Sequence, residues 1–514
     1  MRYLFFLCIP FLLFATPFKV ATYNVENLFD AVSNGTEYEE YIPGKHGWTQ
    51  RMAEIKLDHT AEAICDLDAD IVALQEVENE AVFHALQKRL KRVGCPYRYG
   101  AITTKKGAPI QVALLSRFPM KKKKELQVNY SPYVRNILET EVTVDGHTLT
   151  IFSNHWKSKS RKGYESKRIA CAKVLKKRID AMPAGKEYLI VGDLNSNYDA
   201  HMTLPKKLND TEGRTGLNHV LHTVENNVLL SKKQMLNAPR GWHYDLWNEL
   251  PFKERWSHKF YGHRSTLDHI LLPASLFDGK GIDYVNGSFG VFRDKPLMTS
   301  RGRINHWEIK HGKHTGKGYS DHLPVFARFD TRPYVASSND DIKKAVKGTI
   351  EDLYGQKHLE QPVVLENVVV VLKRGRYAVL KQSPKGRGIF VFGAVQDMHE
   401  GKQYDIKVQE ISVYQGLKEI TALVRLKEKG TVSLEPYYAP LSMLRQNEVV
   451  RNIEGIYKKG YVYVDGKSIP LYFKNRKLTP KNGSKIKIAY AHIGYYKKLQ
   501  LVIYSKKDFQ IIGE

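Results

Sequence analysis

The sequence predicts a layered α+β region followed by an all-β region. In the first region, from 19 to 329, short apolar runs alternate with amphipathic stretches of helical period. Beyond Pro362 the helical pattern stops, and short strand-like runs repeat with a period of about 84 residues. A chain of 514 residues is expected to form roughly two to four folding units, each with room for its own core.

The elements of the first region follow from its sequence in order. Strand-like runs are bounded by polar turns, and helix-like runs place apolar residues three and four positions apart. Strands interleaved with helices indicate an α/β or a layered α+β domain. Strands are expected in KVATYNV, DIVALQEV, VALLSRF, ILETEVTV, LTIFSNH, EYLIVGDLN, TLDHILL and LPVFARF, and helices at 52–67, 81–93 and 166–179.

The first residues have the layout of a secretory signal. Arg2 precedes an apolar run from Tyr3 to Phe14, and the small residues Ala15 and Thr16 follow. The run is too short to cross a bilayer, and an N-terminal strand or a membrane tether is the alternative. We therefore expect a periplasmic or secreted protein whose mature chain has no integral membrane span.

A polar stretch around Pro333 predicts the boundary between the two regions. A linker helix is expected after it, with one apolar face formed by Ile342, Val346, Ile350 and Leu353. The expected organisation is a signal peptide at 1–16, a first domain at 17–332, a linker with a helix at 333–361, and small barrels at 362–445 and 446–514.

Net charge narrows the class of partner. The chain has 80 Lys and Arg against 54 Asp and Glu, which gives a formal charge of +26. Because apolar residues make up 42% of the chain, disorder is disfavoured, and the excess charge indicates a polyanionic partner such as nucleic acid or an anionic membrane. Residues 340–514 hold 31 basic and 18 acidic side chains, so the all-β region is the more basic one.

Cysteine usage predicts little cross-linking. Once the N-terminal segment is removed, Cys65, Cys95 and Cys171 remain, which permits at most one internal disulfide. Cys65 and Cys171 lie in helix-like apolar patterns, so buried free thiols are expected there.

Polar residues gather where the predicted strands of the first region end or begin. Any one of them is more often a turn or a helix cap than a functional residue. As an ordered set they indicate a site, because open sheets expose functional groups at strand ends. The set comprises Asn24, Glu26, Glu76, His155, Asp193, Asn195, Asp268, Asp321 and His322.

The same residues carry a resemblance to a known family. Over residues 19–330 the chain contains TYNVENLF, LQEVE, LLSRFP, SNHWKSK, GDLNS, STLDHI and SDHLPV. In this order the motifs resemble the endonuclease/exonuclease/phosphatase superfamily, which includes pancreatic deoxyribonuclease. The resemblance implies that the catalytic domain at 17–332 is a four-layer sandwich of two packed β-sheets flanked by helices, with the active site at one edge.

The resemblance also implies a metal site. Glu76 matches the metal-binding Glu of the family. Glu26 and Asn24 fall where relatives place a second metal or amide contact, and Asp321 matches a further carboxylate of the metal site. Because Mg²⁺ takes oxygen ligands and keeps several waters, one or two carboxylates suffice. Mg²⁺ is therefore the expected cofactor, with Mn²⁺ as a substitute.

The catalytic set is implied in the same way. His322 matches the catalytic His of the family, and Asp268 matches the carboxylate that fixes the imidazole tautomer and raises its basicity. Asp193 and Asn195 match the pair that orients the nucleophile and the substrate phosphate. His155 matches the second His of the deoxyribonuclease-like branch.

One departure concerns the partner of His155. In pancreatic deoxyribonuclease a Glu between the LQE and SR motifs supports the second His, whereas no acidic residue occurs here between Glu80 and Glu125. Four basic residues near the motifs could bind flanking phosphates or form a solvated basic face. They are Arg117, Arg135, Lys157 and Lys159.

Both β-rich repeats resemble oligonucleotide-binding barrels, and the second is expected to be a degraded copy. Such barrels bind single strands through basic grooves and through aromatic side chains on which bases stack. Four aromatic residues of the first copy are candidates for stacking, although strand alternation turns about half of such a set toward the core. They are Tyr377, Phe390, Phe392 and Tyr414.

Together these features predict a secreted or periplasmic nuclease that uses Mg²⁺ to hydrolyse phosphodiester bonds in DNA, with RNA as the other polymer. The basic barrels would hold the polymer during cleavage. One alternative is a phospholipid or inositol phosphodiesterase of the same superfamily, in which Trp242, Trp247 and Trp256 could form a lipid-inserting loop. The other is a nucleic-acid-binding or uptake protein without catalysis.

Overall fold

The computed structural model describes residues 17–513, apart from 161, 261, 332–344, 357, 358, 360, 376, 394, 396 and 397. The expected signal peptide at 1–16 and the expected linker segment 333–344 lie outside the described residues. The chain divides into two compact units, with the main boundary between residues 337 and 338.

Two β-sheets pack face to face in the first unit. Their strand orders are β15-β19-β1-β2-β4-β3, with β16 beside β19, and β11-β14-β8-β7-β6-β5. Alternate residues of the strands, such as Val20, Ile71 and Val191, fill the space between the sheets. The first sheet contains β1 (Phe18–Leu28), β2 (Ile71–Val77), β3 (Tyr99–Ile102), β4 (Gln111–Ser116), β15 (Asp283–Tyr284), β16 (Gly290–Val291) and β19 (Val325–Asp330). The second contains β5 (Met120–Leu126), β6 (Ile137–Val144), β7 (His147–His155), β8 (Tyr188–Asp193), β11 (Tyr244–Asp245) and β14 (Asp268–Leu272).

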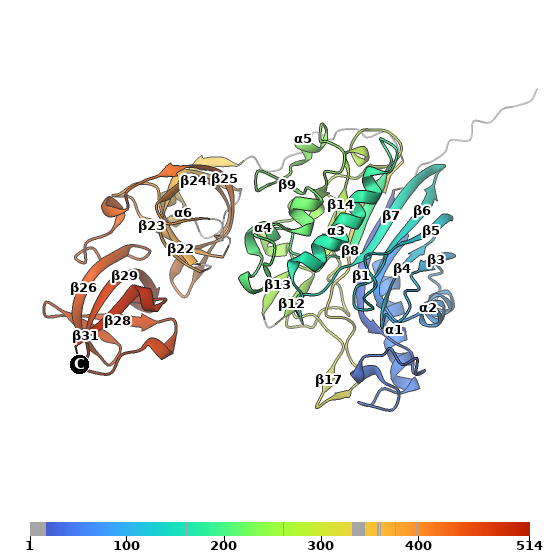
Figure 1. Ribbon diagram of the computed structural model, residues 1–514, viewed down its shortest axis with the longest axis horizontal. Coiled ribbons are helices and arrows are strands. Elements are labelled where there is room, and N and C mark those ends of the chain that lie inside the picture. Colours follow the sequence, from blue (N-terminus) through green and yellow to red (C-terminus); the bar gives the residue numbers. More distant parts are fainter. Residues whose placement is uncertain are drawn as a thin grey trace, which may run out of the picture. The chain divides into compact units, whose positions relative to one another are not determined.

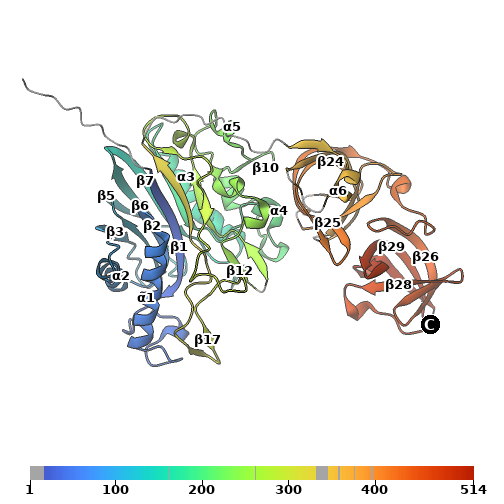
Figure 2. The same cartoon turned by 180° about the vertical axis from the view of Figure 1, so that it is seen from behind.

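Helices cover the outer faces of both sheets, which gives four layers. Leu57 of α1 and Phe83 of α2 pack on the first sheet, and Leu175 of α3 packs on the second. Figure 1 shows α3 in front of β8, and Figure 2 shows α1 beside β1. The predicted four-layer sandwich is confirmed. The helices are α1 (Gln50–Leu67), α2 (Glu80–Arg92) and α3 (Glu165–Asp180), with the short α4 (Ala200–Thr203) and α5 (Lys232–Met235).

A disulfide joins the last turn of α1 to the loop after α2. Cys65 pairs with Cys95, and their Cα atoms are 5.8 Å apart. The expected free thiol at Cys65 was therefore wrong, because a contact between residues distant in the sequence places a second cysteine beside it. Cys171 is free and buried, as expected.

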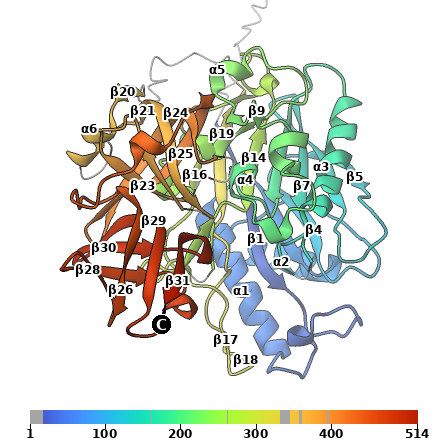
Figure 3. The same cartoon turned by 60° about the vertical axis from the view of Figure 1, so that its left-hand side comes forward.

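Short hairpins extend from the sandwich. They are β9–β10 (Val224–Glu225, Val228–Leu229), β12–β13 (His258–Phe260, His263–Ser265) and β17–β18 (Ile309–Lys310, Lys313–His314). The last of these lies near the start of α1 (Figure 3). It is anchored by buried His314, which accepts a hydrogen bond from Trp307 Nε1 at 2.8 Å. This anchor fixes Trp307, whose backbone reaches the candidate site.

The second unit contains two closed five-stranded barrels of the same topology. Their strand orders are β21-β22-β23-β25-β24 and β26-β27-β28-β30-β29, closed by the pairs β21–β24 and β26–β29. In each barrel the third and fifth strands pair in parallel. The predicted oligonucleotide-binding-like barrels are confirmed. Barrel one contains β21 (Val363–Arg374), β22 (Tyr377–Lys381), β23 (Gly388–Phe392), β24 (Lys402–Tyr414) and β25 (Leu417–Thr431). Barrel two contains β26 (Val449–Lys458), β27 (Tyr461–Val464), β28 (Lys467–Phe473), β29 (Lys485–Tyr496) and β30 (Lys498–Ile503), with β31 (Phe509–Gly513) beside β29.

The expected linker helix is shorter than predicted. Val346 lies in β20 (Val346–Gly348), which pairs in parallel with β21, and only α6 (Ile350–Tyr354) is helical. Thr349 and Asp352 form a capping box that starts α6 at this point. The apolar spacing from Val346 onward thus belongs partly to a strand.

Candidate active site

The predicted site residues of the first unit lie at one edge of the sandwich. β1 and β2 are parallel, as are β7 and β8, so the carboxyl ends of all four strands deliver side chains to that edge. β14 runs antiparallel to β8 and places Asp268 opposite Asp193. β19 runs antiparallel to β1, so residues just before it reach the same edge. The residues delivered in this way are Asn24, Glu26, Glu76, His155, Asp193, Asn195, Asp268, Asp321 and His322.

Asn24 connects the two sheets at the centre of the site. Its Nδ2 donates to Glu76 Oε1 on the neighbouring strand and to Asp193 Oδ2 on the opposite sheet, both at 3.1 Å. The second oxygen of Glu76 accepts from the Asn27 backbone N at 2.9 Å. Both carboxylates are thereby held in fixed orientations.

Glu26 is a half-buried carboxylate beside this cluster. Its backbone N donates to Asn24 Oδ1 at 3.0 Å, and its Oε2 accepts from the Trp307 backbone N at 3.2 Å. Burial raises the pKa of Glu26 well above its usual range, and the charge of Asp321 raises it further. Burial likewise raises the pKa values of Glu76 and Asp193.

This donor set fits a hard divalent cation. Desolvation and neighbouring carboxylates raise the pKa values of Glu26, Glu76 and Asp193, so a positive charge among them would stabilise their ionised forms. Their oxygen atoms are the ligands that Mg²⁺ prefers. Glu76, Glu26 and Asp321, with the Asn24 amide, are the residues that would hold it.

His322 and Asp268 form the predicted pair. His322 Nδ1 lies 2.8 Å from Asp268 Oδ2, and Ser257 Oγ donates to the same oxygen at 2.5 Å. Burial opposes a charge on His322, but Asp268 and Asp321 outweigh it and raise its pKa well above the usual range. With Nδ1 directed at Asp268, Nε2 faces the carboxylate cluster, 3.9 Å from Asp193 Oδ2.

His155 lies on the other side of Asp193. Its Nε2 is 3.5 Å from Asp193 Oδ2 and 3.7 Å from Glu76 Oε1. Its buried Nδ1 has no hydrogen-bond partner among the described residues, in agreement with the missing acidic residue noted in the sequence. Burial, followed by the charge of Arg135, lowers the pKa of His155 well below its usual range. A neutral His155 therefore faces a His322 that favours the charged form.

The backbone is strained where three of these residues lie. Glu26, Glu76 and Asn195 have φ values of 52°, 67° and 49°, in the left-handed region that side chains other than glycine rarely adopt. Such conformations persist where the surrounding structure imposes them, and they cluster at functional sites. Asn195 is fixed further because its N donates to Asp193 Oδ1 at 2.8 Å and its Nδ2 donates to Trp156 O at 3.1 Å.

Of the four predicted phosphate contacts, Arg117 lies away from the candidate site. Arg117 pairs with Asp68 and Asp70, which precede β2 and therefore lie at the opposite end of that strand from Glu76. A role for Arg117 at this edge was therefore wrong, because β4 runs antiparallel to β2.

Arg135 is close to the site, where it supports the backbone that carries His155. It is buried, and it donates to the carbonyl oxygens of Tyr133, His155 and Trp156. These carbonyls use three of its N–H groups, and its predicted phosphate contact stays a prediction. Lys157 and Lys159 follow His155 directly and are half-buried. Burial lowers the pKa of Lys159 to about 8.

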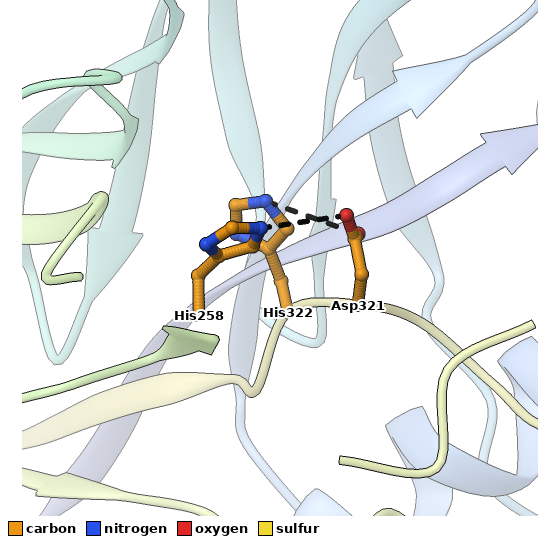
Figure 4. Close-up of side chains that lie close together, drawn as sticks. All are labelled: His258, Asp321 and His322. Atoms are coloured by element: carbon orange, nitrogen blue, oxygen red, sulfur yellow. Dashed lines mark ion pairs between the residues drawn. The ribbon is translucent and has the colours of Figure 1, made fainter. Parts of the chain in front are cut away.

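Two side chains at the site were missed from the sequence. His258 Nε2 lies 3.6 Å from Asp321 Oδ2, and its ring centroid is 4.8 Å from that of His322. Figure 4 shows His258 and His322 side by side, with both rings directed toward Asp321. The sequence signal that could have identified His258 was the strand-like alternation of SHKF, just before the STLDHI motif.

Lys56 is the other. Its side chain is fully buried on the inner face of α1, where its Nζ donates to Tyr319 O at 2.5 Å. Burial lowers its pKa to about 8, against the raising effect of Glu26 and Asp321. A lysine at a core position of the helical pattern of 52–67 was the signal.

Barrel two covers part of the predicted stacking set of barrel one. Phe390 is 6% exposed and stacks on His492 of barrel two, with ring centroids 4.9 Å apart. Tyr377 packs against Tyr504 at 5.4 Å. Barrel two occupies the outer surface of Phe390 in this arrangement, whereas Tyr377 is half-buried and its base-stacking role stays a prediction. Phe392 and Tyr414 are 39% and 63% exposed.

Comparison with known proteins agrees with this architecture. The family described as the Endonuclease/Exonuclease/phosphatase family matches residues 19–331. The chain belongs to this family. Its members are hydrolases of phosphate esters that generally depend on a divalent metal. No curated protein matches the chain.

Several solved structures are similar to part of the chain. A humanised D. rerio TDP2 is 14% identical and has a TM-score of 0.38, with 61% of this chain and 99% of that chain covered. Truncated Caenorhabditis elegans TDP2 is 16% identical and has a TM-score of 0.36, with 61% and 98% covered. A family protein from Bacteroides thetaiotaomicron is 13% identical and has a TM-score of 0.38, with 62% and 98% covered.

The described part of the chain contains no helix with the length and apolar character needed to cross a membrane.

Trp247 and Trp256 are buried in the sandwich, and Trp247 Nε1 donates to Asp268 O at 2.8 Å. Trp242 packs partly buried against the same core. Trp247 therefore supports the strand that carries Asp268, and the packing of all three tryptophans argues against a lipid-inserting loop.

Proposed function

We propose that this protein is a Mg²⁺-dependent nuclease that hydrolyses phosphodiester bonds of DNA. The observation that carries the proposal is the His322–Asp268 pair, whose free Nε2 faces the cluster of Glu76 and Asp193. This arrangement offers a base and a cluster of oxygen ligands within the same few ångströms, as phosphodiester hydrolysis requires.

The chain's own groups divide the work as follows. Asp268 holds the Nδ1 proton of His322, so Nε2 of the neutral ring can accept a proton from the attacking water. Neutral His155 presents Nε2 to the same space and can donate to an oxygen of the phosphate or of the leaving group. Asn24 fixes both carboxylates, and Asp193 fixes Asn195. When bound, Mg²⁺ would supply a Lewis acid that offsets the charge growing on the phosphate.

A polymeric, anionic substrate is supported by the charge and by the second unit. The formal charge of +26 favours binding of nucleic acid, and the two barrels have the topology of small oligonucleotide-binding domains. The barrels would hold the polymer while the first unit cleaves it.

We also propose that the protein acts in the periplasm or outside the cell. The basic residue and apolar run at the start of the sequence support export. The Cys65–Cys95 disulfide is a feature that oxidising compartments favour.

Cleavage assays test the proposal directly. The purified full chain with Mg²⁺ should convert supercoiled plasmid and linear DNA to fragments. The His322→Ala variant should lose this activity, and His84→Ala, which removes an exposed histidine of α2, should keep it. Wild-type protein that leaves DNA and RNA intact but releases phosphocholine from sphingomyelin would favour the lipid alternative. Binding to DNA without cleavage in Mg²⁺ would favour a binding protein.

A further inference from the structure

The two barrels use the same outer surface differently. In barrels of this topology the outer face of the second and third strands is the usual ligand surface. That surface is formed by β22 and β23 in barrel one and by β27 and β28 in barrel two. Strand register allows the two surfaces to be compared position by position.

In barrel one this surface is the contact for barrel two. Val379 and Phe390 are buried in a cluster that includes Tyr490 and Tyr504 of barrel two. Lys381, on the same face, pairs with Glu448 at 2.8 Å, and both side chains are almost fully buried. A ligand cannot reach these side chains while the barrels are packed together.

In barrel two the corresponding surface is open and carries tyrosines. Tyr463 and Tyr472 are 45% and 42% exposed, and Tyr461 lies on the same face of β27 as Tyr463. Tyr461 pairs with Pro470, which is two residues from Tyr472, so the three rings occupy neighbouring positions. We call Tyr461, Tyr463 and Tyr472 the tyrosine face.

Lysines border the tyrosine face. Lys458 pairs with Tyr461 across β26 and β27, and Lys498 Nζ lies 2.5 Å from Tyr461 Oη and 4.7 Å from its ring centroid. Residues 446–514 contain 14 basic and 5 acidic side chains. Among the described acidic residues of this segment, three are held in ion pairs, and Asp465 forms none with the described residues. The three are Glu448, Glu454 and Asp508.

Exposed aromatic rings bordered by uncompensated lysines suit a single-stranded nucleic acid. Unpaired bases stack on aromatic side chains, whereas the bases of a duplex are already stacked on one another. The lysines would neutralise the phosphates between the bases.

We propose that the tyrosine face of barrel two binds single-stranded nucleic acid, and that the equivalent surface of barrel one serves as its dock. The proposal rests on the proposed function, since it assigns the surface that holds the substrate polymer. It also moves the binding role from the first copy of the repeat, where the sequence placed it, to the second.

Binding by the full chain in EDTA tests this without cleavage. A fluorescein-labelled oligothymidylate of about 20 nucleotides is titrated and followed by fluorescence anisotropy. Tyr463→Ala and Tyr472→Ala should each raise the Kd about tenfold, and Tyr→Phe variants at both positions should bind as wild type because stacking is kept. Tyr99→Ala is the control, since Tyr99 is an exposed tyrosine at the end of the first sheet opposite the active site. A combined Lys458→Gln and Lys498→Gln variant should weaken binding and reduce its salt dependence.

The outcomes separate this inference from the proposed function. Wild-type affinity in the Tyr463→Ala/Tyr472→Ala variant, with unchanged thermal unfolding, overturns the inference even when plasmid cleavage in Mg²⁺ is intact. Loss of affinity in that variant supports it even if the wild type cleaves nothing. Equal binding of duplex DNA, or of vesicles containing phosphatidylserine, with the same dependence on the tyrosines would also overturn it.

Discussion

The active-site edge of the first unit and the tyrosine face of barrel two handle charge in opposite ways. At the edge, carboxylates are buried close together, and burial raises the pKa values of Glu26, Glu76 and Asp193. On the tyrosine face, lysines stand at the surface with few carboxylates nearby. The first arrangement attracts a cation and the second attracts a polyanion. Cleavage and retention of the polymer are therefore expected to respond to different perturbations.

The largest effect is expected from Glu76→Gln. The substitution keeps the shape of the side chain and removes the charge that would hold Mg²⁺, so DNA cleavage should fall about 10⁴-fold. Binding of oligothymidylate in EDTA should not change. The measurement is cleavage rate against Mg²⁺ concentration, with Glu80→Gln on the exposed start of α2 as control. Full activity at ordinary Mg²⁺ would remove Glu76 from the metal site.

Asp268→Asn should lower the cleavage rate about 10³-fold, because His322 loses the partner that orients it. The pH dependence should also shift in a defined direction. His322 must be neutral to accept a proton, and Asp268 raises its pKa. The acid limb of the rate profile should therefore move to lower pH in the variant. An exposed counterpart, Asp278→Asn, should leave the profile unchanged, and a limb that moves upward would contradict this role.

Lys381→Met tests how firmly barrel two covers barrel one. The substitution leaves Glu448 buried without its lysine, although Arg445 still contacts it at 2.6 Å. We expect a loss of about 3 kcal/mol in the free energy of unfolding of the second unit, measured by denaturant titration. Lys385→Met, at an exposed position of the same barrel, should cost almost nothing. Unchanged stability would mean that the buried ion pair does not hold the barrels together.

His258→Phe should have the smallest effect, about a tenfold loss of cleavage rate with little change in thermal unfolding. The reason is that Asp321 loses a neighbour 3.6 Å away while the packing against His322 is kept. The Mg²⁺ concentration needed for half-maximal rate should rise as well. His263→Ala, on the exposed strand of the same hairpin, is the control. A rate equal to wild type would make His258 a packing residue only.

The sequence predicted the sandwich and most of its site because both depend on short segments. Each strand motif ends in its polar residue, and strand direction then places Asn24, Glu76 and Asp193 at one edge. Arg117 also belonged to a motif, but the antiparallel register of β4 carries it to the other end of the sheet. A motif shows which residues are neighbours in the chain, but it does not always show at which end of the sheet a residue lies.

The features that the sequence did not predict arise from contacts between segments that are distant in the chain. His258 reaches the site because the β12–β13 hairpin forms a bridge to His322, a pairing that no local pattern encodes. The Cys65–Cys95 bond joins α1 to the loop after α2, and no local pattern relates these two segments. The burial of Phe390 depends on how one repeat packs on the other, whereas strand alternation reports only which residues face outward.

The left-handed backbone at Glu76 has an evolutionary consequence. Its φ of 67° would suit glycine, and relief of that conformation is worth about 1–2 kcal/mol. A relative of this fold with glycine or asparagine at this position would lose the carboxylate and gain stability. In descendants of this fold, heightened thermal tolerance would then accompany loss of catalysis, as a trace of the stability that the active enzyme forgoes.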